Sequence, residues 1–324
     1  MTEKILVTGA AGNIGAALVK KLLENENYFV VAVDNFSTGH IKNLPSNNDK
    51  YFKFIKCDIN EYLDISSIMT LHRFDYVFHY AAVVGVERTI NNPIMVLRDI
   101  DGFKNILTLS KNTGVKRVLF SSSSEVYGEP VEFPQHEETT PLNSRITYAV
   151  VKNVGESFLK AYQREYGLDY TIFRFFNTFG PNQTSDFVIP RFIIAALEDK
   201  DITIYGDGKQ TRTFCYIDDN IEATIEILRS GSYINDIVNI GNDVETSIID
   251  LAKIIIRITG SRSKIVFLPP LKEGDMQRRK PDNSKMRKIL KRELISIEDG
   301  IRRTAKDIKE KNSFASDKVI YQSM

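Results

Sequence analysis

Apolar and polar residues alternate in blocks along the first two-thirds of the chain. Short runs such as KILVTG (4–9) are apolar throughout, which is typical of strands that helices cover on both faces. We predict strands at residues 4–9, 29–35, 51–59, 74–82, 115–124 and 169–177. Several of the intervening stretches have helical periodicity, including residues 16–25, 94–113 and 147–167. This alternation predicts an α/β domain with a parallel sheet between two layers of helices.

The pattern changes after Gly180 and Pro181, where the segments become shorter and more mixed. We therefore predict a second, smaller domain of mixed α/β type in the C-terminal part of the chain. The expected first domain is 1–180 with about 213–241, the second is about 181–212 with 242–310, and 311–324 is a polar tail that frays.

The composition is that of a soluble globular protein, with 42% hydrophobic and 26% charged residues. A net charge of +1 gives no field that favours nucleic acid or an anionic membrane surface. No segment has the ~18 uninterrupted apolar residues of a membrane helix, and the N-terminus does not read as a signal peptide. We therefore expect a cytoplasmic location. Cys57 and Cys215 lie too far apart to predict a metal site or a disulfide framework.

A glycine-rich loop, VTGAAGNIGAAL, follows the first predicted strand and opens the first helix. Gly9, Gly12 and Gly15 allow a tight turn, close approach of a pyrophosphate and close packing of helix on strand. The free N–H groups of the helix N-terminus, including those of Asn13 and Ile14, favour a phosphate. This context predicts a dinucleotide site on a Rossmann-type, doubly wound sheet.

An acidic residue ends the second predicted strand. Asp34 is placed to accept hydrogen bonds from the adenosine ribose and to repel a 2′-phosphate, so we predict NAD instead of NADP, with Asn35 beside it. Asp58 and Ile59 follow the third strand and are candidates for contact with adenine, although a turn-initiating aspartate fits equally well.

Tyr148 and Lys152 lie four residues apart in the helix predicted at 147–167, and are therefore neighbours on its surface. A tyrosine has a pKa of ~10 and is a poor base at neutral pH. A nearby ammonium group favours the phenolate, and we expect Lys152 to lower the pKa of Tyr148 in this way. The phenolate is then able to take a proton from a sugar hydroxyl while a hydride leaves for NAD.

Serines at the end of the strand predicted at 115–124 complete this pattern, because ligands bind at the C-terminal edge of open parallel sheets. The order TGAAGNIG, VDN, HYAA, SSSSEVYG, YAVVK and FRFFNTFGP resembles the extended short-chain dehydrogenase/reductase superfamily, in its nucleotide-sugar branch. The resemblance covers nearly the whole chain. It implies that Ser123 binds the reacting hydroxyl, Tyr148 is the base, Lys152 also holds the nicotinamide ribose, and Ala81 contacts the cofactor.

The same resemblance implies a nucleotide-diphosphate sugar, with UDP or GDP, as the substrate. Asn177 would reach the diphosphate, the segment that contains Val188 and Arg191 would cover the nucleobase, and Arg212 would bind a phosphate. Further substrate contacts would come from Ser124, Asp275 and Arg278 or Arg279.

Members of this branch first oxidise the sugar, commonly at C4, and differ in the step that follows. We predict a 4-epimerase of surface-polysaccharide precursor synthesis. Ser124 and Glu125 stand where many 4,6-dehydratases have Asp-Glu, and some UDP-glucuronate decarboxylases have Ser-Glu there. A C4 dehydrogenase, a decarboxylase and a dehydratase therefore remain alternatives, with a non-catalytic NAD(H) sensor as a remote one. A catalytic role for Glu125 and a structural one are equally favoured.

Two further expectations come from the resemblance. Asp99 stands where the family usually has asparagine, which places an extra acid near the cofactor. The predicted helices 94–113 and 147–167 have apolar stripes and would pair with those of a second copy in a four-helix homodimer interface.

Overall fold

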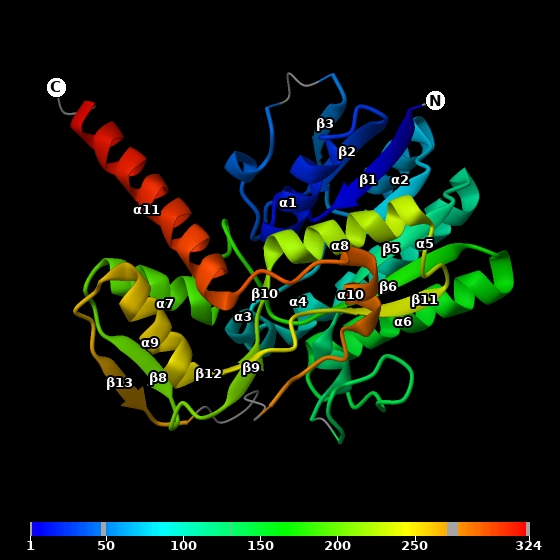
Figure 1. Cartoon of the computed structure of the whole chain (residues 1–324). Helices are drawn as coiled ribbons and strands as arrows, with labels where there is room; N and C mark the ends of the chain where they lie inside the picture. Colours follow the sequence, from blue (N-terminus) through cyan, green and yellow to red (C-terminus); the bar gives the residue numbers. More distant parts are fainter. Residues whose placement is uncertain (1, 47–49, 130, 271–277, 322–324) are drawn as a thin grey trace.

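A seven-stranded parallel sheet forms the centre of the computed structural model, which describes residues 2–46, 50–129, 131–270 and 278–321 (Figure 1). The strand order is β11-β6-β5-β4-β1-β2-β3, and every neighbouring pair is parallel. The strands are β1 (Glu3–Thr8), β2 (Tyr28–Asp34), β3 (Phe52–Lys56), β4 (Tyr76–His79), β5 (Arg117–Ser123), β6 (Asp169–Phe175) and β11 (Asp236–Ile240). The predicted Rossmann-type α/β fold is confirmed.

Helices cover both faces of this sheet. Because successive side chains of a strand point to opposite faces, Ile5 and Val7 of β1 join one hydrophobic core and Leu6 joins the other. The first core contains residues of α1 (Asn13–Leu22) and α8 (Ile217–Ser230), and α10 (Ser284–Leu290) packs on α8. The second contains residues of α2 (Tyr62–His72), α5 (Asp99–Thr113) and α6 (Thr147–Tyr166).

The strand order reverses at β1, which pairs with β2 on one side and with β4 on the other. The connections that leave β1 and β4 therefore diverge above the C-terminal edge of the sheet. This is the position where open α/β sheets bind their ligands. A short 3-10 helix, η2 (Ser124–Tyr127), continues β5 at the same edge, and a second one, η1 (Ile41–Asn43), follows β2.

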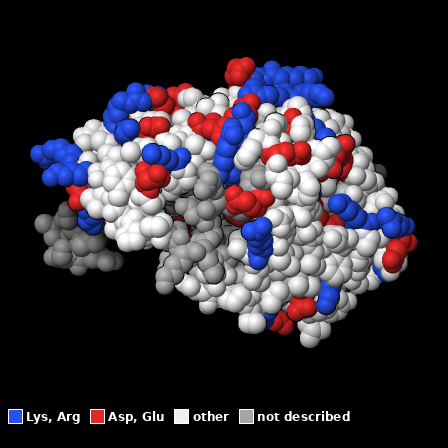
Figure 2. Space-filling view, turned by 90° about the horizontal axis from the view of Figure 1, so that it is seen from below, with Lys and Arg blue, Asp and Glu red and all other residues white. Residues whose placement is uncertain are grey.

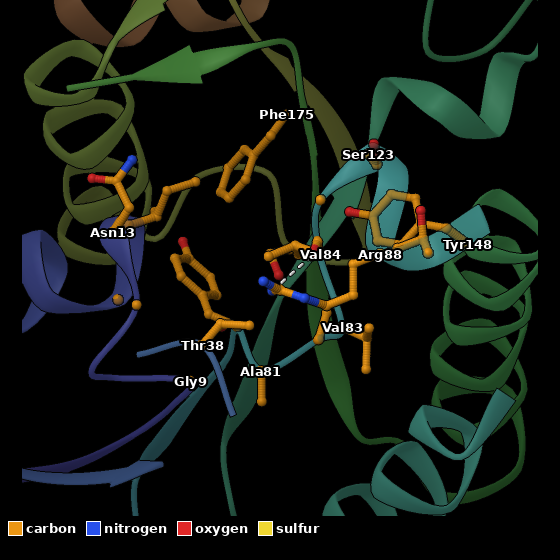
Figure 3. Close-up of a pocket in the computed structure, with 18 of the residues that line it drawn as sticks. Gly9, Asn13, Thr38, Ala81, Val83, Val84, Arg88, Ser123, Tyr148 and Phe175 are labelled. Carbon is orange, nitrogen blue, oxygen red and sulfur yellow. Dashed lines mark hydrogen bonds between the residues drawn. The ribbon is translucent and has the colours of Figure 1, made fainter. Parts of the chain in front are cut away.

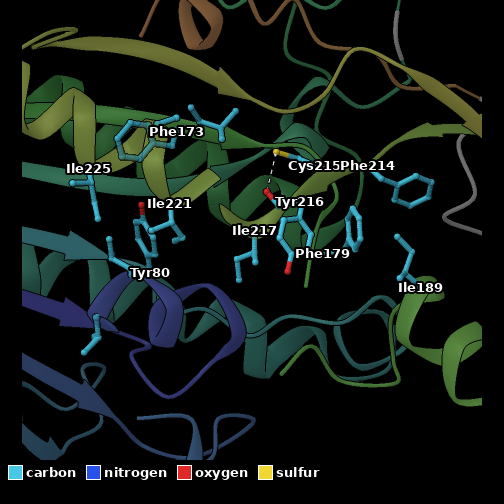
Figure 4. Close-up of a cluster of buried hydrophobic side chains, with 14 of the residues drawn as sticks. Tyr80, Phe173, Phe179, Ile189, Phe214, Cys215, Tyr216, Ile217, Ile221 and Ile225 are labelled. Atoms are coloured by element: carbon cyan, nitrogen blue, oxygen red, sulfur yellow. Dashed lines mark hydrogen bonds between the residues drawn. The ribbon is translucent and has the colours of Figure 1, made fainter. Parts of the chain in front are cut away.

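The smaller domain contains short strands and helices and lies on the left-hand side of Figure 1. The helices α7 (Val188–Leu197), α9 (Ile248–Thr259) and α11 (Ile297–Tyr321) pack on one another. Its strand pairs are β8 (Ile202–Tyr205) with β13 (Ile265–Leu268) and β9 (Thr211–Thr213) with β12 (Glu245–Ser247). A buried cluster that includes Tyr80, Phe173, Phe214 and Ile189 joins the two domains (Figure 4). The pair β7 (Thr178–Phe179) and β10 (Cys215–Tyr216) crosses this junction.

One predicted helix differs from the structure. The helix predicted at 94–113 is divided into α4 (Pro93–Leu97) and α5, after a separate α3 (Val86–Asn91). Arg98 keeps helical angles, but the Asp101 amide bonds to Arg98 O three residues back at 3.0 Å, which interrupts the α-helical pattern. The polar tail expected at 311–324 includes the end of α11, which continues to Tyr321 through a sequence without proline or glycine after residue 300.

The surface carries mixed charge. Figure 2 shows Lys and Arg side chains interspersed with Asp and Glu over the described part of one face, as the net charge of +1 suggests. No helix among the described residues combines the length and the apolar character needed to cross a membrane.

Candidate active site

A cavity of about 470 Å³ lies at the C-terminal edge of the sheet, between the two domains (Figure 3). All of the predicted cofactor-binding residues and all four catalytic candidates line it. Of the predicted substrate contacts, Ser124, Asn177, Val188 and Arg279 line it as well. The cavity therefore brings together residues from the glycine loop, from the end of β5, from α6 and from a segment near the C-terminus.

The glycine loop has the geometry that a dinucleotide requires. Gly9 has φ +65°, and a Cβ atom there would lie 2.7 Å from the backbone nitrogen of Ala81. A Cβ atom on Gly15 would overlap the carbonyl oxygen of Gly9. Helix α1 begins directly after Gly12 with no acidic side chain in its first turn, which leaves its N-terminal partial positive charge for a phosphate. The buried Asn13 Oδ1 has no hydrogen-bond partner among the described residues.

Asp34 holds the loop and faces the cavity. Its Oδ2 accepts the Ala11 N–H at 2.9 Å, and its Oδ1 accepts the Phe36 N–H at 2.7 Å. Burial raises the pKa of this carboxyl group, while the two backbone hydrogen bonds oppose the change. Each carboxylate oxygen keeps a second lone pair for a ribose hydroxyl. These features fit an adenosine ribose without a 2′-phosphate.

Lys152 is buried behind the reacting edge of the site. Its Nζ donates to Ser121 O at 2.7 Å and lies 5.8 Å from the centre of the Tyr148 ring. Burial lowers the pKa of Lys152 to about 8, and the nearby Asp99 opposes this. Asp99 lines the cavity and accepts the Val83 N–H at 2.9 Å, and burial raises its pKa. Asp99, which is partly buried, thus gives Lys152 an acidic neighbour.

The expected effect of Lys152 on the tyrosine is wrong for the protein alone. Burial raises the pKa of Tyr148, and this outweighs the hydrogen bond with Ser123, which lowers it. The neighbouring charges also act on the ring, since Glu125 and Asp99 raise the pKa and Arg279 lowers it. In its predicted role as a base at neutral pH, Tyr148 would be assisted by a further positive charge beside the ring, which lowers the pKa of a phenol.

An ion pair that the sequence did not reveal lies next to these residues. Arg279 Nη2 donates to Glu125 Oε2 at 2.6 Å, and Arg279 is 5% exposed. The Glu125 backbone amide donates to Ser123 Oγ at 3.2 Å, so the acid is fixed beside the serine that the sequence predicts to be catalytic. Both charged groups line the cavity.

Comparison with known proteins identifies the family. A model of the NAD dependent epimerase/dehydratase family matches residues 5–241. The chain belongs to this family.

Individual relatives within the epimerase/dehydratase family carry different reactions in their names. UDP-glucuronic acid decarboxylase 1 of Xenopus tropicalis is 35% identical over 311 residues, which cover 93% of this chain and 71% of that protein. UDP-glucose 4-epimerase of Thermotoga maritima, solved with UDP-glucose, has a TM-score of 0.89 and 34% identity, and the match covers 95% of this chain and 99% of that one. UDP-glucuronic acid 4-epimerase of Bacillus cereus, solved with its substrate and NAD, has a TM-score of 0.87 and 32% identity over 95% of this chain and 99% of that one.

The epimerase/dehydratase chain is therefore an NAD-dependent enzyme of the nucleotide-sugar epimerase, decarboxylase and dehydratase type. NAD, when bound, supplies the hydride acceptor and a positive charge that would assist Tyr148. The glycine loop and Asp34 would hold its pyrophosphate and adenosine ribose. In the roles predicted from the sequence, Ser123 would align the substrate hydroxyl and Tyr148 would exchange its proton, with Lys152 buried beside them.

Some predicted substrate contacts of this enzyme lie elsewhere. Arg278 forms an exposed ion pair with Glu245, with Nε at 2.5 Å from Oε1. Arg191 lies on α7 with its guanidinium 5.9 Å from the Tyr205 ring centre, and Arg212 on β9 donates to its neighbouring carbonyl, Thr211 O. These three side chains do not line the cavity, and their roles stay predictions. Asp275 lies outside the described residues.

Arg88 and Arg98 are cationic residues of the cavity that the sequence did not indicate as site residues. Arg88 of α3 donates to Val84 O at 3.3 Å and to Asp186 Oδ2 at 3.0 Å, and it reaches into the pocket in Figure 3. Its side chain thereby links the connection after β4 to the segment before α7. Its position after a strand of the parallel sheet was the available signal, but no motif marks the residue.

Proposed function

We propose that this enzyme is a nucleotide-sugar uronate decarboxylase, acting on a UDP-linked hexuronic acid. The observation that carries the proposal is the Arg279–Glu125 pair beside Ser123 and Tyr148. The sequence left the decarboxylase among the alternatives because no cation for a substrate carboxylate was apparent. Arg279 supplies one inside the cavity. The decarboxylase named above is one of the relatives that support this choice.

The chemistry follows from the position of the carboxylate. Removal of the C4 hydrogen as hydride and of the hydroxyl proton by Tyr148 gives a 4-ketone, to which the C6 carboxylate is β. The C5–C6 bond then breaks, carbon dioxide leaves, and the electron pair remains as an enolate. Protonation at C5 and return of the hydride to C4 give a nucleotide pentose with no net redox change. Arg279 orients the carboxylate, and Glu125, ionised in its pair with Arg279, takes a proton from water and passes it to C5.

The test compares products from three substrates with NAD present: UDP-glucuronate, its 2-N-acetyl analogue and UDP-glucose. We expect carbon dioxide and a UDP-linked pentose from an acidic sugar, measured by NMR with 13C at C6. A C4 epimer that retains C6 would favour the second candidate, a 4-epimerase, which the structural neighbours support. Turnover of UDP-glucose alone would refute the decarboxylase.

Arg279→Met is the matching variant. Removing one member of a buried, hydrogen-bonded charge pair costs about 2–5 kcal/mol, so kcat/KM for the acidic sugar should fall by at least about 30-fold. Arg278→Met provides the comparison, because the sequence did not distinguish the two arginines and Arg278 points to Glu245. Equal losses in both variants would contradict the assignment of Arg279.

We infer further that the enzyme forms a homodimer through α4, α5 and α6. Ile94 is 73% exposed, and Leu97 and Val150 are each 40% exposed, on helices that contact one another. These apolar side chains extend the stripe that the sequence predicts for a four-helix interface. Light scattering should give twice the mass of the chain, and Ile94→Asp should shift it toward the monomer. A monomer in the unsubstituted protein would end this proposal.

A further inference from the structure

Three polar side chains form a row across the sheet close to the active site. The strand register places Ser122 of β5 opposite Arg174 of β6, and Arg174 opposite Asn239 of β11. Residues that are opposite one another on parallel strands point to the same face. All three side chains are buried. The row lies one residue before Ser123, the catalytic serine.

Glu156 of α6 binds this row. Tyr148, Lys152 and Glu156 are spaced four apart, so they lie along one face of the helix. Glu156 Oε1 accepts Ser122 Oγ at 2.6 Å, and its two oxygens accept Arg174 Nε at 2.9 Å and Nη2 at 2.7 Å. Glu156 is 1% exposed and Arg174 is 1% exposed. The helix that carries Tyr148 and Lys152 is thus bonded to β6 by a bidentate ion pair and to the end of β5 by the Ser122 hydrogen bond.

The other side of Arg174 reaches the remaining parts of the site. Its Nη1 donates to Tyr127 Oη at 2.8 Å, and Tyr127 Oη donates to Asn239 Oδ1 at 2.8 Å. Tyr127 ends η2, two residues after Glu125. Asn239 Nδ2 donates to Asp282 O at 3.2 Å, in the segment that carries Arg279. The hydrogen-bonded chain therefore contacts every segment that supplies a catalytic candidate.

We propose that the Glu156–Arg174 pair is a positioning device, which holds the Ser123–Glu125 segment, the Tyr148–Lys152 helix and the Arg279 segment in one arrangement. A buried ion pair is weak evidence of net stability, because desolvation offsets much of the attraction between the charges. Its geometry is nevertheless specific, since the planar guanidinium fixes the direction of each hydrogen bond. The pair acts through Ser123, Glu125 and Tyr148 and touches no substrate itself.

The test is the double variant Glu156→Leu with Arg174→Met, which replaces the pair by apolar side chains. We expect kcat to fall by about 100-fold, as small misplacements of catalytic groups do. NAD affinity should change by less than about threefold, because the glycine loop and Asp34, which would hold its pyrophosphate and adenosine ribose, are not bonded to the pair. The rising limb of kcat against pH should move up by about one pH unit, because loosening Ser123 removes the hydrogen bond that lowers the pKa of Tyr148.

Arg117→Met is the matched control. It removes another buried guanidinium from β5, bonded to Thr171 Oγ1 and to Ser232 O, but at the first residue of the strand, roughly 20 Å from Ser123. We expect a similar loss of stability with kcat and its pH limb unchanged. Equal effects on kcat in the control, or an unchanged kcat in the double variant, would overturn the proposal.

A second variant keeps the test decisive if the double variant does not fold. Arg174→Lys retains the charge and loses the bidentate geometry, so the positioning role predicts the same shift of the pH limb and a partial loss of kcat. If Arg174→Lys folds and the rising limb of its kcat–pH profile lies at the same pH as that of the wild type, the proposal is likewise overturned. The measurement uses whichever nucleotide sugar the enzyme turns over, so it stays valid if the reaction proves to be epimerisation.

Discussion

Lys152 provides a quantitative test of the site's electrostatics through the pH dependence of stability. The side chain is 2% exposed, and burial lowers its pKa from 10.5 to about 8. In the unfolded chain the same lysine holds its proton to ~10.4. Between these values the unfolded state binds more protons than the native state, so the contribution of Lys152 to the unfolding free energy rises with pH.

The magnitude follows from the shift. At about 1.4 kcal/mol per pH unit, lowering the pKa from 10.5 to about 8 corresponds to about 3 kcal/mol. This cost of holding a buried ammonium is fully present below pH ~8 and is relieved as the pH rises to ~10.5. Lys152→Met removes the titrating group. We expect the stability of the variant relative to wild type to decline by about 3 kcal/mol across that range.

Urea unfolding, followed by circular dichroism at constant ionic strength and without nucleotide, measures this difference. Lys160→Met is the control, because Lys160 lies on the same helix with an exposed side chain. The unfolding free energy of Lys160→Met should depend on pH in the same way as that of the wild type. If the difference in unfolding free energy between Lys152→Met and wild type stays constant within about 0.5 kcal/mol over this pH range, the argument is refuted. That result would mean that Asp99 keeps Lys152 charged throughout the range.

Two further substitutions test the cofactor loop and the base. Gly15→Ala forces a Cβ atom against Gly9 O and to 2.9 Å from Ala10 Cα, so we expect a loss of about 1–3 kcal/mol in NAD binding, measured by calorimetry; unchanged affinity would contradict the loop geometry. Tyr148→Phe keeps the ring and removes the exchangeable proton, so kcat should fall by about 10²–10⁴ while NAD still binds, and unaltered turnover would exclude Tyr148 as the base.

The strands of the large sheet could be predicted because they are buried on both faces and therefore read as unbroken apolar runs. β1 to β6 each overlap a predicted strand. The small domain was harder to predict from the sequence. Strands such as β10, which has two residues, are too short for a periodicity, and their pairing depends on the tertiary fold. The break at Arg98 is likewise invisible in the sequence, since it comes from hydrogen bonding and not from a helix-breaking residue.

The site divides in the same way. The glycine loop and the Tyr148–Lys152 pair are local in sequence, so spacing alone indicates their geometry. Glu125 and Arg279 are 154 residues apart, and two adjacent arginines offered no reason to choose between them. Only the fold shows that Arg279 turns inward and that Arg278 turns toward Glu245. The depressed pKa expected for Tyr148 also failed, because spacing does not report burial.

The Arg279–Glu125 ion pair, which only the structure shows, also acts on Tyr148. Glu125 raises the pKa of Tyr148 and Arg279 lowers it, so the two charges of the ion pair have opposite effects on the pKa of this tyrosine. A substrate carboxylate that binds Arg279 adds a second negative charge to this pair and favours the protonated phenol. When an acidic sugar binds, the positive charge of the cofactor must therefore lower the pKa of Tyr148 by a larger amount. A neutral sugar adds no charge and leaves this pKa unchanged. The pKa of Tyr148 would in this way contribute to discrimination between acidic and neutral sugars.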